Sequence, residues 1–164
     1  MAESVPPQAI PLPDLSATRR LAGALARLAR PGDTIALSGD LGAGKTELAR
    51  AFIRARLGRA DEEVPSPTFT LVQTYGDGEE EIWHADLYRL TRPEEALELG
   101  LEDAFGHALV VLEWPDRIAR LLPRDRLDLA IGFTGADGGR TATLTPHASW
   151  IDRMPGLTQA GSEP

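Results

Sequence analysis

Apolar residues recur at helical spacing in two long segments of the chain. In the first, Leu21, Leu25 and Leu28 share one face, and Ser16 just before them is a candidate N-cap. In the second, apolar positions continue to residue 57, where Gly58 is placed to end the helix. Three shorter stretches are also expected to be helical. The predicted helices cover residues 17–30, 47–57, 91–99, 101–105 and 118–122.

Runs of apolar and β-branched residues between these segments predict strands. One run, 108–112, contains only apolar residues before Glu113, which is typical of a strand buried on both faces. The segment 76–80 separates two runs and predicts a hairpin turn, and 135–140 is a second Gly-rich turn. The predicted strands cover residues 34–38, 69–75, 81–88, 108–113, 127–133 and 141–145.

Length and composition indicate one domain. The chain has 164 residues, of which 42% are apolar, enough for one hydrophobic core. No segment has the roughly 18 consecutive apolar residues of a membrane-spanning helix. There is no cysteine, which excludes disulfides and thiolate metal sites. Because no basic segment followed by an apolar stretch stands near Met1, a cytoplasmic protein is expected.

The charge is unevenly distributed along the chain. The net charge is −8, yet residues 61–115 alone contain 14 acidic and two basic residues. A surface this acidic repels a phosphate backbone, so direct binding of DNA or RNA is not expected. Most of these charges are interpreted as a solvated face, and a basic protein partner is the alternative.

Residues 39–46 fit the pattern G-x-x-x-x-G-K-[ST] between a predicted strand and a predicted helix. Glycines in such a loop let successive backbone N–H groups turn toward a phosphate. Lys45 would add a point charge and Thr46 a hydroxyl for Mg²⁺. Lys45 is the only lysine among 17 basic residues, so the chain keeps an ammonium where this chemistry uses one. The candidate phosphate-binding residues are Gly39, Asp40, Leu41, Gly42, Ala43, Gly44, Lys45 and Thr46.

A site that hydrolyses nucleotides also needs an acid for the metal and a group that places water. Glu113 ends the apolar run 108–112 and Asp86 ends the run before it, so both are candidates. Thr68 lies in the loop after the phosphate-loop helix, where it could sense a γ-phosphate or simply form a turn. The chain has no Asn and no Leu-Ser-Gly-Gly segment, which excludes Asn-Lys-x-Asp GTPases and ABC-type ATPases. ATP is therefore the expected nucleotide.

The histidines and one tryptophan allow weaker interpretations. His84 lies on a predicted strand, and His107 and His147 have no partner pattern, so all three are interpreted as structural. Trp114 directly follows Glu113 and is either a core residue or a lid near the nucleotide.

Four motifs occur in an order that is similar to one protein family. They are Gly-Asp-Leu-Gly-Ala-Gly-Lys-Thr at 39–46, Ser-Pro-Thr-Phe-Thr at 66–70, His-Ala-Asp-Leu-Tyr-Arg at 84–89 and Glu-Trp-Pro at 113–115. An Ile-Pro-Leu-Pro-Asp segment at 10–14 precedes them. The arrangement resembles the TsaE (formerly YjeE) family, bacterial ATPases of tRNA threonylcarbamoyladenosine synthesis. The resemblance covers about residues 10–145, and its specificity comes from the four motifs together.

The resemblance implies a role for each matching residue. Lys45 and the loop backbone would bind the phosphates of ATP or ADP, and Thr46 and Glu113 would hold Mg²⁺. Asp86 would support hydrolysis, and Thr68 would belong to a switch-like loop. Trp114, Thr18 and Arg140 match positions near the nucleotide.

The resemblance also implies a fold and partners. The expected fold is α/β, a P-loop NTPase-like three-layer domain with a mixed sheet that contains an antiparallel hairpin. The expected domain covers residues 10–147, with weakly ordered termini at 1–9 and 148–164. Family members associate with the TsaB–TsaD heterodimer and are thought to reset it by ATP binding and slow hydrolysis. Contact with tRNA is expected only through that complex.

Two other classes of protein share the phosphate-loop pattern. A small-molecule kinase needs a basic lid over the transferred phosphoryl group, and only Arg89 and Arg92 lie within residues 61–115. A non-catalytic ATP-sensing module would bind nucleotide without needing turnover. In such a module Lys45 would be required, whereas Glu113 and Asp86 would be dispensable.

Overall fold

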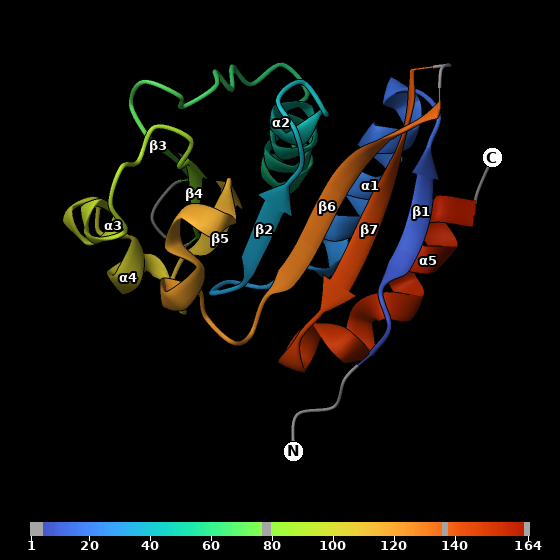
Figure 1. The fold of residues 1–164 in the computed structure, drawn as a ribbon. Helices are drawn as coiled ribbons and strands as arrows, with labels where there is room; N and C mark the ends of the chain where they lie inside the picture. The colour runs from blue at the N-terminus through green and yellow to red at the C-terminus, as the bar shows by residue number, and fades with distance from the viewer. Residues whose placement is uncertain (1–4, 77–79, 136–137, 163–164) are drawn as a thin grey trace.

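Seven strands form one mixed sheet in the computed structural model, which describes residues 5–76, 80–135 and 138–162 (Figure 1). Their order across the sheet is β1-β7-β6-β2-β5-β4-β3. The pairs β4/β5, β5/β2 and β2/β6 are parallel, and the outer pairs are antiparallel. The strands are Gln8–Leu12 (β1), Thr34–Ser38 (β2), Val72–Gly76 (β3), Glu81–Asp86 (β4), Leu109–Glu113 (β5), Leu127–Thr134 (β6) and Gly139–Pro146 (β7). The predicted α/β class and mixed sheet are confirmed.

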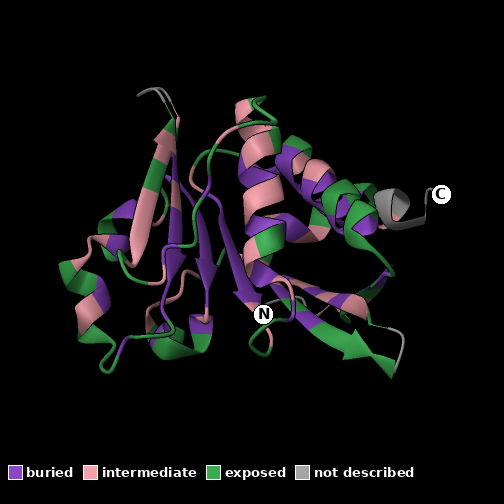
Figure 2. Ribbon diagram, turned by 90° about the horizontal axis from the view of Figure 1, so that it is seen from above, coloured by how far each residue is buried: buried purple, intermediate pink, exposed green. Residues whose placement is uncertain are grey.

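Helices cover both faces of the sheet (Figures 1 and 2). One apolar cluster joins the sheet to α1 (Leu15–Leu28), α2 (Lys45–Leu57) and α5 (Met154–Ser162). A second joins the other face to α3 (Glu94–Glu98), α4 (Leu101–Ala104) and the 3₁₀ helix η1 (Pro115–Leu121). Every residue of β5 is buried, as its unbroken apolar run predicts, because each face meets one cluster. In the described part of the chain, no helix is long and apolar enough to cross a membrane.

The predicted hairpin is present as β3 and β4, but it begins later than predicted. β3 begins at Val72 and not at residue 69, because Leu71 has φ +69° and turns the chain. The carbonyl of Leu71 accepts a hydrogen bond of 2.9 Å from the N–H of Asp86, which closes the pairing at that end. Asp77, Gly78 and Glu79 of the predicted turn lie outside the described residues, as do Ala136 and Asp137 of the second turn.

The first long helix begins two residues earlier than its predicted cap suggests. Asp14, and not Ser16, is the N-cap, and its Oδ1 accepts a hydrogen bond of 2.9 Å from the N–H of Ala17. A side chain caps a helix by accepting a hydrogen bond from an N–H two or three residues ahead. The N-cap is therefore the polar residue directly before the first helical residue, which here is Asp14. The predicted end of α2 is correct, since Gly58 adopts the left-handed conformation there.

The C-terminal segment after residue 147 is helical, whereas the sequence predicted weak order there. Ala148–Arg153 forms the 3₁₀ helix η3, and α5 follows it directly. Trp150, Met154 and Leu157 are buried in the same cluster as α1. Trp150 comes from η3 and the other two from α5, and their burial in one apolar cluster orders both helices. The folded unit therefore extends beyond the predicted boundaries of 10 and 147, from β1 to α5.

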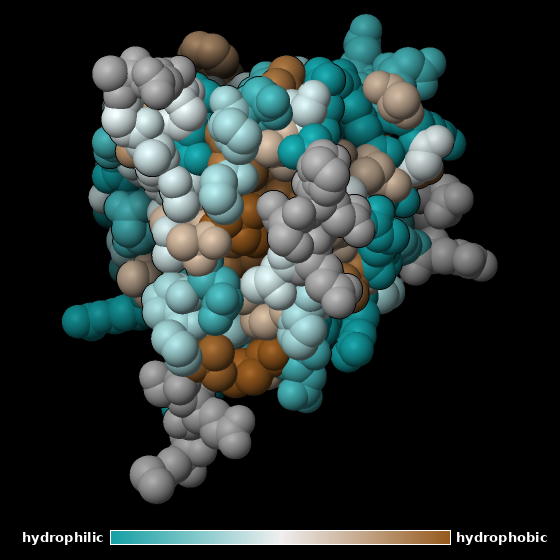
Figure 3. Space-filling model, turned by 90° about the vertical axis from the view of Figure 1, so that its right-hand side faces the viewer, coloured by the Kyte–Doolittle hydropathy of each residue, from teal (hydrophilic) through white to brown (hydrophobic). Residues whose placement is uncertain are grey.

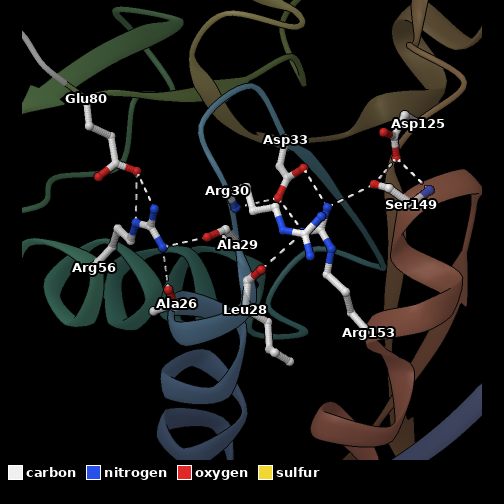
Figure 4. A network of polar contacts seen from close by, with 10 residues as sticks. All are labelled: Ala26, Leu28, Ala29, Arg30, Asp33, Arg56, Glu80, Asp125, Ser149 and Arg153. Carbon is white, nitrogen blue, oxygen red and sulfur yellow. Dashed lines mark hydrogen bonds and ion pairs between the residues drawn. The ribbon is translucent and has the colours of Figure 1, made fainter.

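A buried ion pair ties this segment to the end of α1 (Figure 4). Arg153 donates to both carboxylate oxygens of Asp33, at 2.6 and 3.1 Å. It also donates to the carbonyl of Leu28 at 3.1 Å and to the hydroxyl of Ser149 at 2.9 Å. Bidentate geometry with further hydrogen bonds is what makes a buried ion pair tolerable in a protein interior.

The side of the molecule that carries β1 and α5 is shown in Figure 3, where apolar surface appears between hydrophilic side chains. β1 is an edge strand that pairs with β7 alone. It contains Pro11, which has no backbone N–H to offer to a further strand. This composition limits edge-to-edge association of the sheet.

Candidate functional site

The segment between β2 and α2 forms a tight loop at the carboxyl edge of the parallel strands. Gly39, Gly42 and Gly44 have φ angles of +140°, +80° and +113°, which other residues rarely adopt. A Cβ atom at Gly39 would lie 2.4 Å from the carbonyl oxygen of Ile131 in β6. The backbone is therefore held closely against β6 in the kind of turn that a phosphate-binding loop requires.

Lys45, the first residue of α2, has its ammonium folded back onto this loop. Its Nζ donates to the carbonyls of Gly39 at 2.6 Å and Asp40 at 2.9 Å. The side chain is buried, and burial lowers the pKa of Lys45 below its usual 10.5, an effect that nearby carboxylates, Glu113 first, partly oppose. The cation is thus already inside the loop where a phosphate would need it.

Thr46 and Glu113 meet although they are far apart in sequence. Thr46 Oγ1 donates to Glu113 Oε1 at 2.7 Å. Thr46 lies in the first turn of α2, and Glu113 is the last residue of β5 and is buried. The carboxylate therefore stands beside the loop, on the side of the sheet that α2 covers.

Asp86 lies directly beside Glu113 across the sheet. The two residues are register partners in the parallel pair β4/β5. Asp86 is buried, and its Oδ2 accepts a hydrogen bond of 3.1 Å from Thr68 Oγ1, while Oδ1 accepts one of 3.0 Å from the N–H of Tyr88. The loop that contains Thr68 thus closes onto the second acid of the site.

Trp114 lies next to Lys45 and Tyr88. Its ring centroid lies 4.2 Å from Lys45 Nζ and 4.9 Å from the ring of Tyr88. The residue has φ +62°, so the chain turns sharply as it leaves β5. It is half-buried and packs on the second apolar cluster. The side chain therefore packs against the apolar cluster and also lies next to the loop. A place in the core and a place near a nucleotide, the two expected alternatives, are compatible.

A small cavity beside the loop is lined by two further sequence candidates, Thr18 and Arg140. It has a volume of about 150 Å³, and its lining includes Thr18, Gly42, Gly44, Ile131 and Arg140. Arg140 Nη2 donates to the carbonyl of Gly42 at 3.2 Å. Thr18 and Arg140 thus come from opposite ends of the chain to the same side of the loop.

The remaining loop candidates differ in exposure. Asp40 and Leu41 are exposed, whereas Ala43 is buried, and the Ala43 N–H donates to the carbonyl of Asp40 at 3.0 Å.

Two of the three histidines lie outside the site. His107 is exposed, and His147 contacts Asp128 at 2.8 Å.

One residue of the site was missed by sequence reasoning. His84, interpreted as structural, is buried with its Nε2 2.7 Å from Glu113 Oε2. A signal was available, because residues two apart on a strand share a face and His84 precedes Asp86 by two. That face is also the one on which Glu113 lies.

The oxygen donors suit Mg²⁺ bound together with a phosphate group. Within residues 5–76, 80–135 and 138–162, no three His, Asp or Glu side chains form a metal-binding group. Mg²⁺ in nucleotide sites commonly takes one or two protein oxygens and completes its shell with phosphates and water. The Thr46 hydroxyl and the Glu113 carboxylate, 2.7 Å apart, are such a pair.

Comparison with known proteins assigns the chain to a family. The sequence model for "Threonylcarbamoyl adenosine biosynthesis protein TsaE" matches residues 12–141. The chain belongs to the TsaE family. The resemblance indicated by the four motifs is thereby confirmed, and with it membership in a family of tRNA threonylcarbamoyladenosine biosynthesis.

Individual relatives agree with this assignment to TsaE. The Rickettsia conorii protein is 46% identical over 130 residues, which are 79% of this chain and 74% of that relative. The Bacillus subtilis protein is 40% identical over 129 residues, 78% of each chain. The Rickettsia felis protein is 46% identical, and the aligned 105 residues are 61% of its length. All three are named tRNA threonylcarbamoyladenosine biosynthesis protein TsaE.

The fold agrees as well. The crystal structure of Bacillus subtilis YdiB superposes with a TM-score of 0.74 at 31% identity, covering 99% of this chain and 96% of that one. The α/β fold with a seven-stranded mixed sheet is thus shared over essentially the whole chain, including the C-terminal helices.

Proposed function

We propose that this TsaE-family protein is a P-loop ATPase and an accessory subunit of the bacterial complex that makes N6-threonylcarbamoyladenosine next to the tRNA anticodon. The observation that carries the proposal is the convergence of Lys45, Thr46, Asp86 and Glu113 at the carboxyl edge of β2, β4 and β5. Ligands of open α/β sheets bind at this edge. The proposal includes the fold expected from the sequence, a three-layer P-loop NTPase domain.

Binding of ATP uses groups that are already aligned. The loop N–H groups and the N-terminus of α2 bind the phosphates. Lys45 exchanges the carbonyls of Gly39 and Asp40 for phosphate oxygens, which removes the cost of a cation buried among carbonyls. Thr46 and Glu113 would hold Mg²⁺, which would supply positive charge beside the phosphates.

Hydrolysis follows from the position of the second acid. Asp86 accepts a hydrogen bond from the attacking water and so aligns its oxygen with the γ-phosphorus. The new phosphorus–oxygen bond forms as the bond to the β–γ bridging oxygen breaks, which yields ADP, phosphate and a proton. Thr68 now donates to Asp86 at 3.1 Å, and its loop rearranges when a γ-phosphate is present.

The base and ribose of the nucleotide lie on the side of the small cavity. Thr18 and Arg140 line that cavity together with the loop glycines. Trp114 is next to the loop because its ring contacts the Lys45 ammonium. These three residues are proposed nucleotide contacts. Each one links nucleotide occupancy to a different element, namely α1, β7 and the turn after β5.

The proposed partner is the TsaB–TsaD heterodimer, which ATP binding and hydrolysis would reset in the cytoplasm. Large exposed apolar side chains support a protein partner at the loop edge, since Leu41, Phe69 and Phe133 are 65%, 83% and 54% exposed. Leu41 lies in the loop, Phe69 in the Thr68 segment and Phe133 near the end of β6. The acidic segment between residues 61 and 115 leaves tRNA contact to the partner subunits.

The deciding experiment measures the modified nucleoside in tRNA. Cells whose sole copy carries Lys45→Ala should lose threonylcarbamoyladenosine, as measured by nucleoside digestion and mass spectrometry, whereas Arg59→Ala, a change at an exposed side chain, should not. The purified variant must also fail to bind ATP. Unchanged nucleoside content in cells whose variant cannot bind ATP would reject the proposal.

A further inference from the structure

His84 has an environment that neither a purely structural role nor the proposed hydrolysis explains. Its side chain is 0% exposed, and its Nε2 lies 2.7 Å from Glu113 Oε2. Because a carboxylate only accepts, the hydrogen of this bond belongs to His84. The other ring nitrogen, Nδ1, is buried without a hydrogen-bond partner among the described residues. An apolar side chain would fill this space without that cost, so the bond to Glu113 is what a histidine contributes here.

The sheet aims this bond at one oxygen of Glu113. His84 pairs with Val111 in the register of β4 and β5, and Glu113 is two residues further along the same face. His84 therefore approaches Oε2 from within the sheet, while Thr46 donates to Oε1 from α2. The carboxylate cannot rotate without breaking at least one of these hydrogen bonds, both of which are 2.7 Å long.

We propose that His84 is a positioning residue for Mg²⁺, acting through Glu113. It occupies Oε2 and thereby keeps Oε1 directed at the Thr46 hydroxyl, the other group that would hold the ion. This inference rests on the proposed function, because it requires that Thr46 and Glu113 hold Mg²⁺. Partners that orient a ligating carboxylate typically contribute about 10–100-fold to metal affinity or activity.

The test compares nucleotide binding with and without Mg²⁺. His84→Phe retains a ring of similar size but has no donor, and His84→Gln offers an amide N–H near the position of Nε2. His84→Leu is a second variant without a donor, for use if the phenylalanine does not fold. His147→Phe is the matched control, since His147 also contacts a carboxylate, Asp128, at 2.8 Å but lies away from the loop.

The affinity of a fluorescent ADP analogue is measured for each folded protein in Mg²⁺ and in EDTA, beside its melting temperature. His84→Phe should reduce the enhancement by Mg²⁺ about 10–100-fold and leave the affinity in EDTA unchanged. His84→Gln should restore most of the enhancement, and His147→Phe should not alter it.

Two results would overturn the inference. One is an unchanged Mg²⁺ enhancement in folded His84→Phe or His84→Leu protein. The other is an equal loss of affinity in Mg²⁺ and in EDTA, which would mean that His84 only supports packing. If the unsubstituted protein binds nucleotide without any effect of Mg²⁺, the proposed metal site itself is wrong, and that outcome is recognised before any variant is measured.

Discussion

The ammonium of Lys45 lies 4.2 Å from the centroid of the Trp114 ring while it donates to two carbonyls of its own loop. A buried cation held in this way is ready to bind an anion, but it is costly in the free protein, since burial lowers its pKa.

This cost predicts a pH dependence of stability. The folded pKa of Lys45 lies below the unfolded value of 10.5, so between the two values the unfolded chain binds more protons. The free energy of unfolding therefore rises with pH over this interval below 10.5. Lys45→Met removes this contribution. The free energy of unfolding of the variant, minus that of the unsubstituted protein, should therefore decrease as pH increases. Urea unfolding from pH 8 upward measures the difference, in which contributions of Tyr75 and other shared groups cancel. A pH-independent difference would contradict the prediction.

Asp86→Asn should separate binding from turnover. The amide keeps the size of the side chain but cannot accept a proton or align water as a carboxylate does. ATP hydrolysis in the presence of TsaB–TsaD should fall by about 10²–10⁴-fold, with little change in ATP affinity. Phosphate release and a fluorescent ATP analogue measure the two quantities. Asp116→Asn, at an exposed acid of η1, is the control. Full turnover in the Asp86 variant would contradict the proposed role of Asp86 in hydrolysis.

Gly39→Ala should be far more damaging than an alanine at another glycine of positive φ. The new Cβ would meet the carbonyl oxygen of Ile131 at 2.4 Å, in addition to the backbone strain at φ +140°. We expect a loss of more than about 3 kcal/mol in the free energy of unfolding, together with loss of nucleotide binding. Gly58→Ala, at φ +68° with no neighbour within 4 Å, should cost only about 1–2 kcal/mol. Equal effects in urea unfolding would contradict the close approach to β6.

Arg153→Met should destabilise the protein by about 3–5 kcal/mol, because it leaves the buried carboxylate of Asp33 without its ion pair (Figure 4). Adding Asp33→Asn to this variant should recover part of the loss, since the uncompensated charge is then removed. Arg59→Met, at a side chain 65% exposed, should change stability by less than about 0.5 kcal/mol. If all three proteins unfold at the same urea concentration, α5 is not held by this pair.

Reversing charge on α3 tests whether the acidic surface contacts a partner. Glu94 and Glu98 are exposed, so Glu94→Lys and Glu98→Lys leave the core intact. Each should weaken association with TsaB–TsaD by about 0.5–2 kcal/mol at low salt, and by less as salt is added. Titration calorimetry at two salt concentrations measures this, with Asp152→Lys on η3 as a control for net charge. Unaltered assembly in both α3 variants would assign these acids to a solvated face.

Local features were predictable because they depend on neighbouring residues. The alternation of helices and strands, the hairpin and the Gly58 end of α2 follow from spacing and backbone preference, and the structure confirms them. The motif at residues 39–46 and the acids at two strand ends were predictable as candidate site residues, because each depends on local pattern. Where two polar residues competed for one role, as Ser16 and Asp14 did for the cap of α1, local pattern was insufficient.

Sequence alone determined the family and the fold class, because motif order and periodicity are properties of the chain itself. It also supplied candidate site residues, but not His84. Tertiary structure alone decided which of them touch. His84 reaches Glu113 across 29 residues, and Arg153 reaches Asp33 across 120. Both contacts depend on how strands and helices are packed, and a shift of one residue in the register of β4 and β5 would turn His84 to the opposite face. Packing of Trp150, Met154 and Leu157 likewise ordered a segment whose local composition predicted little structure.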